Sequence, residues 1–192
     1  MIETGLVQIY CGDGKGKTTA AIGAAVRAAG RGYRVLVARL LKTDDSGEVN
    51  GLVHIPGITV LPCDQNFGFS WNMTQSQRKA AALYYDHCLL TAWNMALGAG
   101  GEEPYDMLVL DEAIGACNLG FVDESGLIKA LKEKPASLEV ILTGCIEKLS
   151  QETDAVRSER EALQEQADYI TEMVMRRHPY ERGIGAREGI EY

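Results

Sequence analysis

The sequence predicts an α/β fold in which a parallel sheet of about six strands is flanked by helices on both faces. Short runs that are apolar throughout recur along the 192 residues, and longer helical patterns lie between them. Continuous apolar runs are typical of strands that are covered on both faces, and their alternation with helices is typical of a parallel sheet. Glycine-rich breaks, such as Gly30-Arg31-Gly32, separate the segments.

The elements follow from these runs in order. The expected strands are Val7–Cys11, Val35–Leu41, Thr59–Cys63, Met107–Leu110, Val140–Thr143 and Tyr169–Met173. The expected helices are Thr18–Ala29, Gln75–Leu97, Glu124–Glu133 and Glu147–Ala167. The last helix has only a thin apolar stripe, which favours a largely solvated surface helix, with a partner-contacting helix as the alternative.

Length and composition predict a single domain over residues 1–192. The net charge of −8 argues against binding to nucleic acid or to a membrane surface. No apolar run reaches the roughly 18 residues that cross a bilayer. The N-terminus has no targeting pattern, and the five scattered cysteines contain no C-x-x-C pair, so we expect a cytoplasmic protein without disulfides or structural zinc.

A glycine-rich stretch between the first strand and the first helix predicts a phosphate-binding loop. Its residues are Gly12, Asp13, Gly14, Lys15, Gly16, Lys17, Thr18 and Thr19. Glycines allow backbone N–H groups to face a phosphate, Lys17 can reach phosphate oxygens, and the Thr18 hydroxyl can ligate Mg²⁺. The sequence therefore predicts a nucleoside triphosphate site on a P-loop NTPase (RecA-like) sheet.

The loop departs from the usual pattern, because Cys11 stands where a glycine is expected and Lys15 adds a second positive charge. This departure argues against ordinary transfer of the terminal phosphate.

Two acidic residues, Asp111 and Glu112, follow the apolar run Met107–Leu110. A carboxylate at a strand end that neighbours a phosphate loop holds Mg²⁺ or its water shell. The pair therefore predicts the metal side of the same site.

Two further segments each allow two interpretations. Phe67, Phe69 and Trp71 form either a loop anchor packed on the core or a platform for a large planar ligand. The basic tail that begins at Arg176 is either a frayed end or a lid over the phosphate loop.

Together these segments resemble the P-loop ATP:corrinoid adenosyltransferases. The resemblance covers most of the chain and is carried by Gly12–Ala21, Gly68–Gln75, Val109–Glu112, Leu138–Gly144 and the end from Ala167 to Tyr192. It implies that Co(I) of a corrinoid, either cobalamin or cobyrinic acid a,c-diamide, attacks the 5′ carbon of ATP and that triphosphate leaves intact.

The resemblance also implies residue roles. Lys17, assisted by Lys15, would neutralise the leaving triphosphate. Thr18 and Glu112 match the family's ligands for Mg²⁺ or Mn²⁺, with Asp111 supporting them. Phe69 and Trp71 match residues that crowd the lower face of the corrin, which makes the cobalt easier to reduce.

A homodimer and an electron-donor flavoprotein are further expectations from the family. A P-loop kinase or ATPase, and a non-catalytic protein that binds ATP and corrinoid, remain as alternatives.

Overall fold

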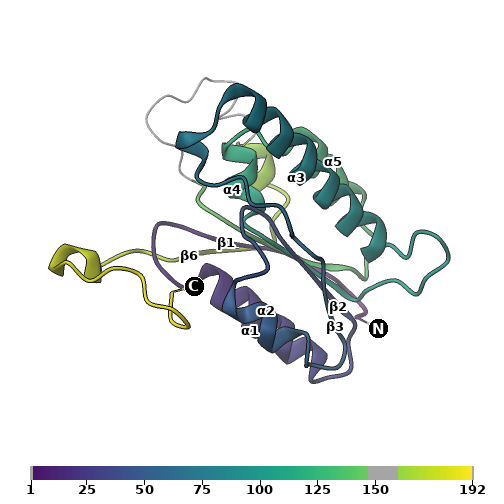
Figure 1. Cartoon of the computed structure of the whole chain (residues 1–192). Coiled ribbons are helices and arrows are strands. Elements are labelled where there is room, and N and C mark those ends of the chain that lie inside the picture. Colours follow the sequence, from purple (N-terminus) through teal and green to yellow (C-terminus); the bar gives the residue numbers. More distant parts are fainter. Residues whose placement is uncertain (1, 147–159, 192) are drawn as a thin grey trace.

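The computed structural model describes residues 2–146 and 160–191 (Figure 1). Six strands form one sheet in the order β3-β2-β4-β5-β1-β6, and every strand pair is parallel. The strands are β1 Val7–Cys11, β2 Val35–Arg39, β3 Ile58–Val60, β4 Met107–Asp111, β5 Glu139–Thr143 and β6 Tyr169–Glu172. The predicted fold class is therefore confirmed, with strand ends that differ by a few residues.

The helices confirm three of the four expected segments. They are α1 Lys17–Ala29, α2 Gly47–Leu52, α3 Gln75–Ala96, α4 Ala113–Asn118 and α5 Glu124–Glu133, with 3₁₀ turns η1 Ser70–Asn72 and η2 Pro179–Arg182. The expected helix Glu147–Ala167 lies mostly outside the described residues. Within its described end, residues 160–164 are helical, with Leu163 of the apolar stripe fully buried and Glu161 exposed.

Helices cover both faces of the sheet. In Figure 1, α1 and α2 lie on one side, and α3, α4 and α5 lie on the other. Successive residues of β2 serve opposite cores, since Val35 and Val37 pack with the alanines of α1 whereas Leu36 and Ala38 pack with α3. This two-sided burial is the reason why the strands are apolar at every position.

Helix α1 begins in a way that leaves its N-terminus available to a ligand. The residue before it, Gly16, has a left-handed φ of 116° and provides no side-chain cap, and the first turn carries no acidic residue. By contrast, Thr74 and Gln77 close the start of α3 with a reciprocal capping box. Uncapped N–H groups at a helix N-terminus favour an anion.

Because all six strands are parallel, the segments that follow them meet at one edge of the sheet. The glycine-rich loop follows β1, Lys42 follows β2, and the aromatic segment follows β3. The ends of β4 and β5 and the tail after β6 lie at this edge as well. The fold therefore gathers the sequence-predicted site residues on one side.

Candidate active site

A cavity of about 630 Å³ lies against the glycine-rich loop. Five loop residues line it, from Lys15 to Thr19, together with Glu112 from the end of β4. The remaining lining residues are Lys42, Ser46, Gly47, Glu48, Gly189, Ile190 and Glu191. The cavity thus combines three lysines with the uncapped start of α1, a combination that suits a polyphosphate.

The first glycines of the loop pack closely against Met173. A Cβ atom on Gly12 or on Gly14 would lie 2.3 or 2.6 Å from the carbonyl oxygen of Met173, and the Gly14 N–H donates to that oxygen at 2.6 Å. Neither glycine lines the cavity, nor does Asp13, which accepts a hydrogen bond from the Met175 N–H at 2.9 Å. In this structure the Gly14 N–H is therefore engaged by the Met173 carbonyl.

Lys17 lines the cavity beside the glycine-rich loop. Its ammonium donates to the Gly14 carbonyl at 2.9 Å, so the side chain curls back over the loop. Lys15 pairs with Glu191 of the tail at 3.5 Å.

The Thr18 hydroxyl is held by the end of β4. It donates to the Asp111 carboxylate at 2.9 Å, and Asp111 is completely buried. Strand β5 separates β1 from β4 in the sheet, and its last residue, Thr143, also donates to Asp111, at 2.7 Å. The buried Asp111 carboxylate therefore fixes the position of the Thr18 hydroxyl.

Glu112 has strained backbone geometry with a φ of 59°. Its N–H donates to the Thr143 hydroxyl at 2.8 Å, and its side chain lines the cavity. Burial raises the pKa of the Glu112 carboxyl, and the neighbouring Asp111 carboxylate raises it further, while the Lys42 and Lys17 ammonium groups oppose that shift.

The oxygen donors of Thr18 and Glu112 fit a hard cation such as Mg²⁺ or Mn²⁺. Among the residues that the structure describes, no group of three or more histidine, cysteine or acidic side chains is arranged for a metal. A site with few protein ligands suits Mg²⁺, which keeps waters and binds through substrate phosphates.

Lys42 and Thr143 both contact the Asp111 carboxylate, and sequence reasoning assigned neither of them to the site. The Lys42 ammonium donates to Thr18 Oγ1 at 2.8 Å and to Asp111 Oδ2 at 2.7 Å. Thr143 is the last residue of an apolar strand, as Asp111 is, and Lys42 follows one. A polar side chain at the end of an apolar run is therefore the sequence feature that could have indicated both.

In the aromatic segment, Phe67 fits one of the two interpretations, and Phe69 and Trp71 fit the other. Phe67 packs against Tyr84 and Tyr85, with ring centroids 5.6 and 5.8 Å apart, so it is a loop anchor. Phe69 and Trp71 are 65% and 75% exposed and stack on each other at 4.6 Å, with planes 11° apart. For these two residues the interpretation as a core anchor is wrong, and their flat exposed faces agree with a platform.

The tail folds back against the phosphate loop instead of fraying. Gly189, Ile190 and Glu191 line the phosphate cavity, and Arg187 holds Glu191 through an ion pair of 2.9 Å. Hydrogen bonds from Arg187 lower the pKa of Glu191 to about 2. A second cavity of about 570 Å³ shares Lys15 and Glu191 and is otherwise lined by tail residues. The lid interpretation is therefore supported.

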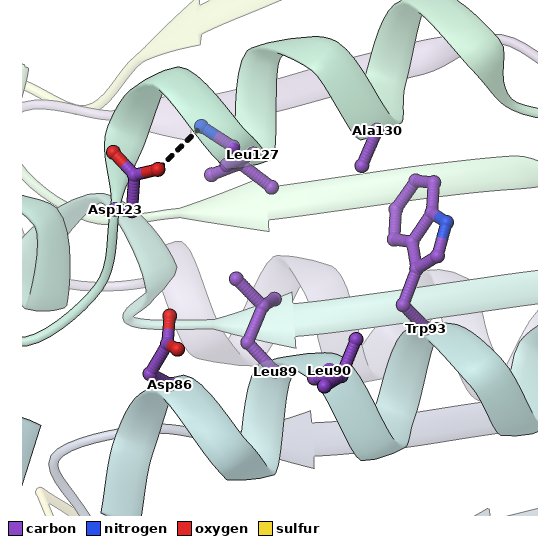
Figure 2. A pocket seen from close by; sticks show the side chains of 8 residues that line it. Asp86, Leu89, Leu90, Trp93, Asp123, Leu127 and Ala130 are labelled. Atoms are coloured by element: carbon purple, nitrogen blue, oxygen red, sulfur yellow. Dashed lines mark hydrogen bonds between the residues drawn. The ribbon is translucent and has the colours of Figure 1, made fainter. Parts of the chain in front are cut away.

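Another cavity, of about 250 Å³, lies between α3 and α5 (Figure 2). Its walls are mainly Leu89, Leu90, Trp93 and Leu127, with Asp86 and Asp123 at one end. Asp123 caps α5, since its carboxylate accepts from the Gly126 N–H at 3.1 Å. The lining of this cavity shares no residue with that of the phosphate cavity.

Residues 3–192 match the model of the family described as ATP:corrinoid adenosyltransferase BtuR/CobO/CobP. The corrinoid adenosyltransferase of Escherichia coli K12 is 30% identical over 191 residues, which cover 99% of this chain and 87% of that protein. The corrinoid adenosyltransferase of Pseudomonas aeruginosa is 28% identical and covers 99% and 85%, and CobA of Salmonella typhimurium is 29% identical and covers 99% and 87%.

Among solved structures, ATPases 2 and 3 of EssC from Geobacillus thermodenitrificans align with a TM-score of 0.47 at 14% identity. That alignment covers 97% of this chain and 35% of the other.

A parallel sheet, a glycine-rich loop before α1 and an acidic strand end beside that loop define a P-loop nucleotide-binding protein. Within that class, the full-length family match is decisive: the chain belongs to the ATP:corrinoid adenosyltransferases. No helix in the described ranges is both long and apolar enough to span a membrane.

Proposed function

We propose that this protein transfers the 5′-deoxyadenosyl group of ATP to the Co(I) centre of a corrinoid and releases triphosphate. The observation that carries the proposal is the three-lysine cavity at the uncapped start of α1, in a chain that matches the adenosyltransferase family from residue 3 to residue 192. The family match over residues 3–192 favours this reaction over that of a P-loop kinase or ATPase.

The electron balance of this reaction explains why no general base is needed. The electron pair of Co(I) forms the bond to the 5′ carbon, and the bond from that carbon to the α-phosphate oxygen breaks. The pair from the broken bond stays on that oxygen, so cobalt is formally oxidised by two electrons and no proton moves. The protein's task is to stabilise the leaving triphosphate, for which Lys15, Lys17 and the N–H groups at the start of α1 are placed.

Thr18 and Glu112 would hold Mg²⁺ or Mn²⁺ at the triphosphate, with Asp111 fixing the Thr18 hydroxyl. When bound, the cation supplies further neutralisation of the phosphate charge. Thr18 donates its hydrogen to Asp111 and accepts one hydrogen bond from Lys42, so one lone pair of its oxygen remains for a cation.

Phe69 and Trp71 would contact the lower face of the corrin. Their stacked rings present an exposed apolar surface, which is unusual for tryptophan and suits a large planar ligand. Displacing the lower axial ligand of cobalt would ease reduction to Co(I).

The cellular setting is proposed from the family resemblance. The chain would act as a single domain and as a homodimer in the cytoplasm, and a flavoprotein would supply the electron that reduces the corrinoid.

An anaerobic assay tests the proposed activity. The protein is mixed with ATP, Mg²⁺ and chemically reduced cobalamin, and in parallel with reduced cobyrinic acid a,c-diamide. We expect an alkyl-cobalt absorption spectrum that disappears on exposure to light, and none without ATP. A corrinoid spectrum that shifts on binding but yields no photolabile product would show a non-catalytic binder.

A further inference from the structure

We infer that Lys42 is a third phosphate-binding lysine of this site and contacts the triphosphate directly. The inference deepens the proposed function and rests on it. Lys42 lines the same cavity as Lys15 and Lys17, and its ammonium reaches Thr18, the residue proposed to hold the metal.

The residue before Lys42 has an unusual backbone conformation. Leu41 has a φ of 59°, and within the described ranges Leu41 and Glu112 are the non-glycine residues with a positive φ. The side chains of Glu112 and Leu41 both lie next to Gly115. A Cβ atom on Gly115 would lie 2.6 Å from Glu112 Oε2 and 3.2 Å from Leu41 Cδ1. Left-handed leucine is unfavourable, and such geometry concentrates at functional sites.

The side chain of Arg39 holds the segment that carries Lys42. Arg39, at the end of β2, is almost completely buried and donates to the Thr43 carbonyl at 2.8 Å. Arg39 also forms an ion pair with Asp44, whose carboxylate accepts from the Cys63 N–H at 3.1 Å. The backbone on the C-terminal side of Lys42 is therefore fixed, while its side chain is 27% exposed at the cavity.

The contacts of Asp111 argue that this carboxylate does not depend on Lys42 alone. Asp111 already accepts from the hydroxyls of Thr18 and Thr143. The carboxylate of Glu48, another acidic residue of the cavity, is 3.7 Å from the Lys42 ammonium, beyond hydrogen-bond distance. The ammonium has three donors, and two are engaged, so one is left for a phosphate oxygen.

Calorimetric titration with inorganic tripolyphosphate tests the inference without corrinoid or turnover. The variants are Lys42→Met, which keeps the length and removes the charge, Lys42→Arg, which keeps the charge, and the charge-balanced double variant Lys42→Met with Asp111→Asn. Lys132→Met, on the exposed side of α5, is the surface control. Thermal unfolding of each variant checks that it is folded.

We expect Lys42→Met to weaken tripolyphosphate binding by about 10- to 100-fold, the loss typical of a hydrogen bond to a charged group. Lys42→Arg should bind more tightly than Lys42→Met, Lys132→Met should bind normally, and the double variant should stay weak. Unchanged binding by Lys42→Met would overturn the inference. Recovery in the double variant would overturn it too, because Lys42 would then serve only to balance Asp111.

This result is distinguishable from failure of the proposed function. A protein that binds tripolyphosphate through Lys42 but forms no cobalt–carbon bond in the anaerobic assay would contradict the function and retain the inference.

Discussion

The hydroxyl of Thr18 lies 2.9 Å from the buried carboxylate of Asp111, and this contact joins the first turn of α1 to the end of β4 across the tip of β5. The contact spans one intervening strand, so the phosphate loop and the acidic strand end are not adjacent in the sheet. Thr143, at the tip of that intervening strand, completes the arrangement by donating to the same carboxylate.

Replacing Thr143 with valine should destabilise the protein. The substitution keeps the shape but removes the donor to Asp111 and the acceptor of the Glu112 N–H, both of them in a buried setting. Unsatisfied buried polar groups cost about 1–3 kcal/mol each, so we expect a loss of that order in the free energy of unfolding, measured in urea. Thr143→Ser keeps the hydroxyl and should cost less; equal losses for both variants would contradict the network.

Lys17→Ala should reduce kcat by about 100- to 1,000-fold, or roughly 3–4 kcal/mol, if its charge stabilises the leaving triphosphate as other preorganised donors stabilise developing charge. The measurement is the rate of alkyl-cobalt formation at saturating ATP. Lys132→Ala, on the surface of α5, is the control. Normal turnover by Lys17→Ala would contradict the role of Lys17 in stabilising the leaving triphosphate.

Trp71→Ala should leave stability nearly unchanged, within about 0.5 kcal/mol, because the side chain is 75% exposed. Turnover that starts from Co(I) corrinoid should be nearly normal, whereas turnover from Co(II) corrinoid with a reductant should fall. Phe67→Ala is the contrasting variant, since Phe67 packs on Tyr84 and Tyr85 and its loss should lower the melting temperature. An equal loss of turnover from both cobalt states would refute the proposed role of Trp71.

Glu112→Gln should stabilise the ligand-free protein at neutral pH. Burial raises the pKa of Glu112 in the folded state, so folding favours the protonated form, and the stability that this group contributes is lost as the pH rises through the raised value. The advantage of the glutamine variant should appear above the ordinary glutamate pKa and vanish below it. Thermal unfolding from pH 4 to pH 8 provides the measurement, and a variant that is less stable across this range would contradict the assigned shift.

Stabilisation by ATP with Mg²⁺ gives a separate test of Glu112. Ligands that bind the folded state raise the melting temperature. If Glu112 holds the cation, adding Mg²⁺ to the ATP complex should raise the melting temperature of the parent protein more than that of Glu112→Gln. Equal shifts would exclude Glu112 as a metal ligand.

The sheet and the phosphate loop could be predicted because their signals are local. Each strand is a continuous apolar run, and the loop is a contiguous motif between a strand and a helix. Helices α2 and α4 were missed because each has only six residues, too few to show a helical period.

Contacts between distant segments could not be predicted in the same way. Gly12 and Gly14 belong to the glycine-rich motif, but the sequence does not show that both also make room for Met173, which follows β6 about 160 residues later. Lys42 and Thr143 each follow or end an apolar strand, but only the strand order shows that both lie beside Asp111. The exposure of Phe69 and Trp71 likewise depends on loop packing that composition does not encode.

If the glycine-rich loop holds an entire triphosphate as a leaving group, that triphosphate leaves ATP in one piece. Phosphorus NMR of the products formed from ATP and reduced corrinoid decides this point. We expect intact tripolyphosphate in equal amount to the alkyl-cobalt product. ADP and inorganic phosphate as the phosphorus-containing products would contradict it.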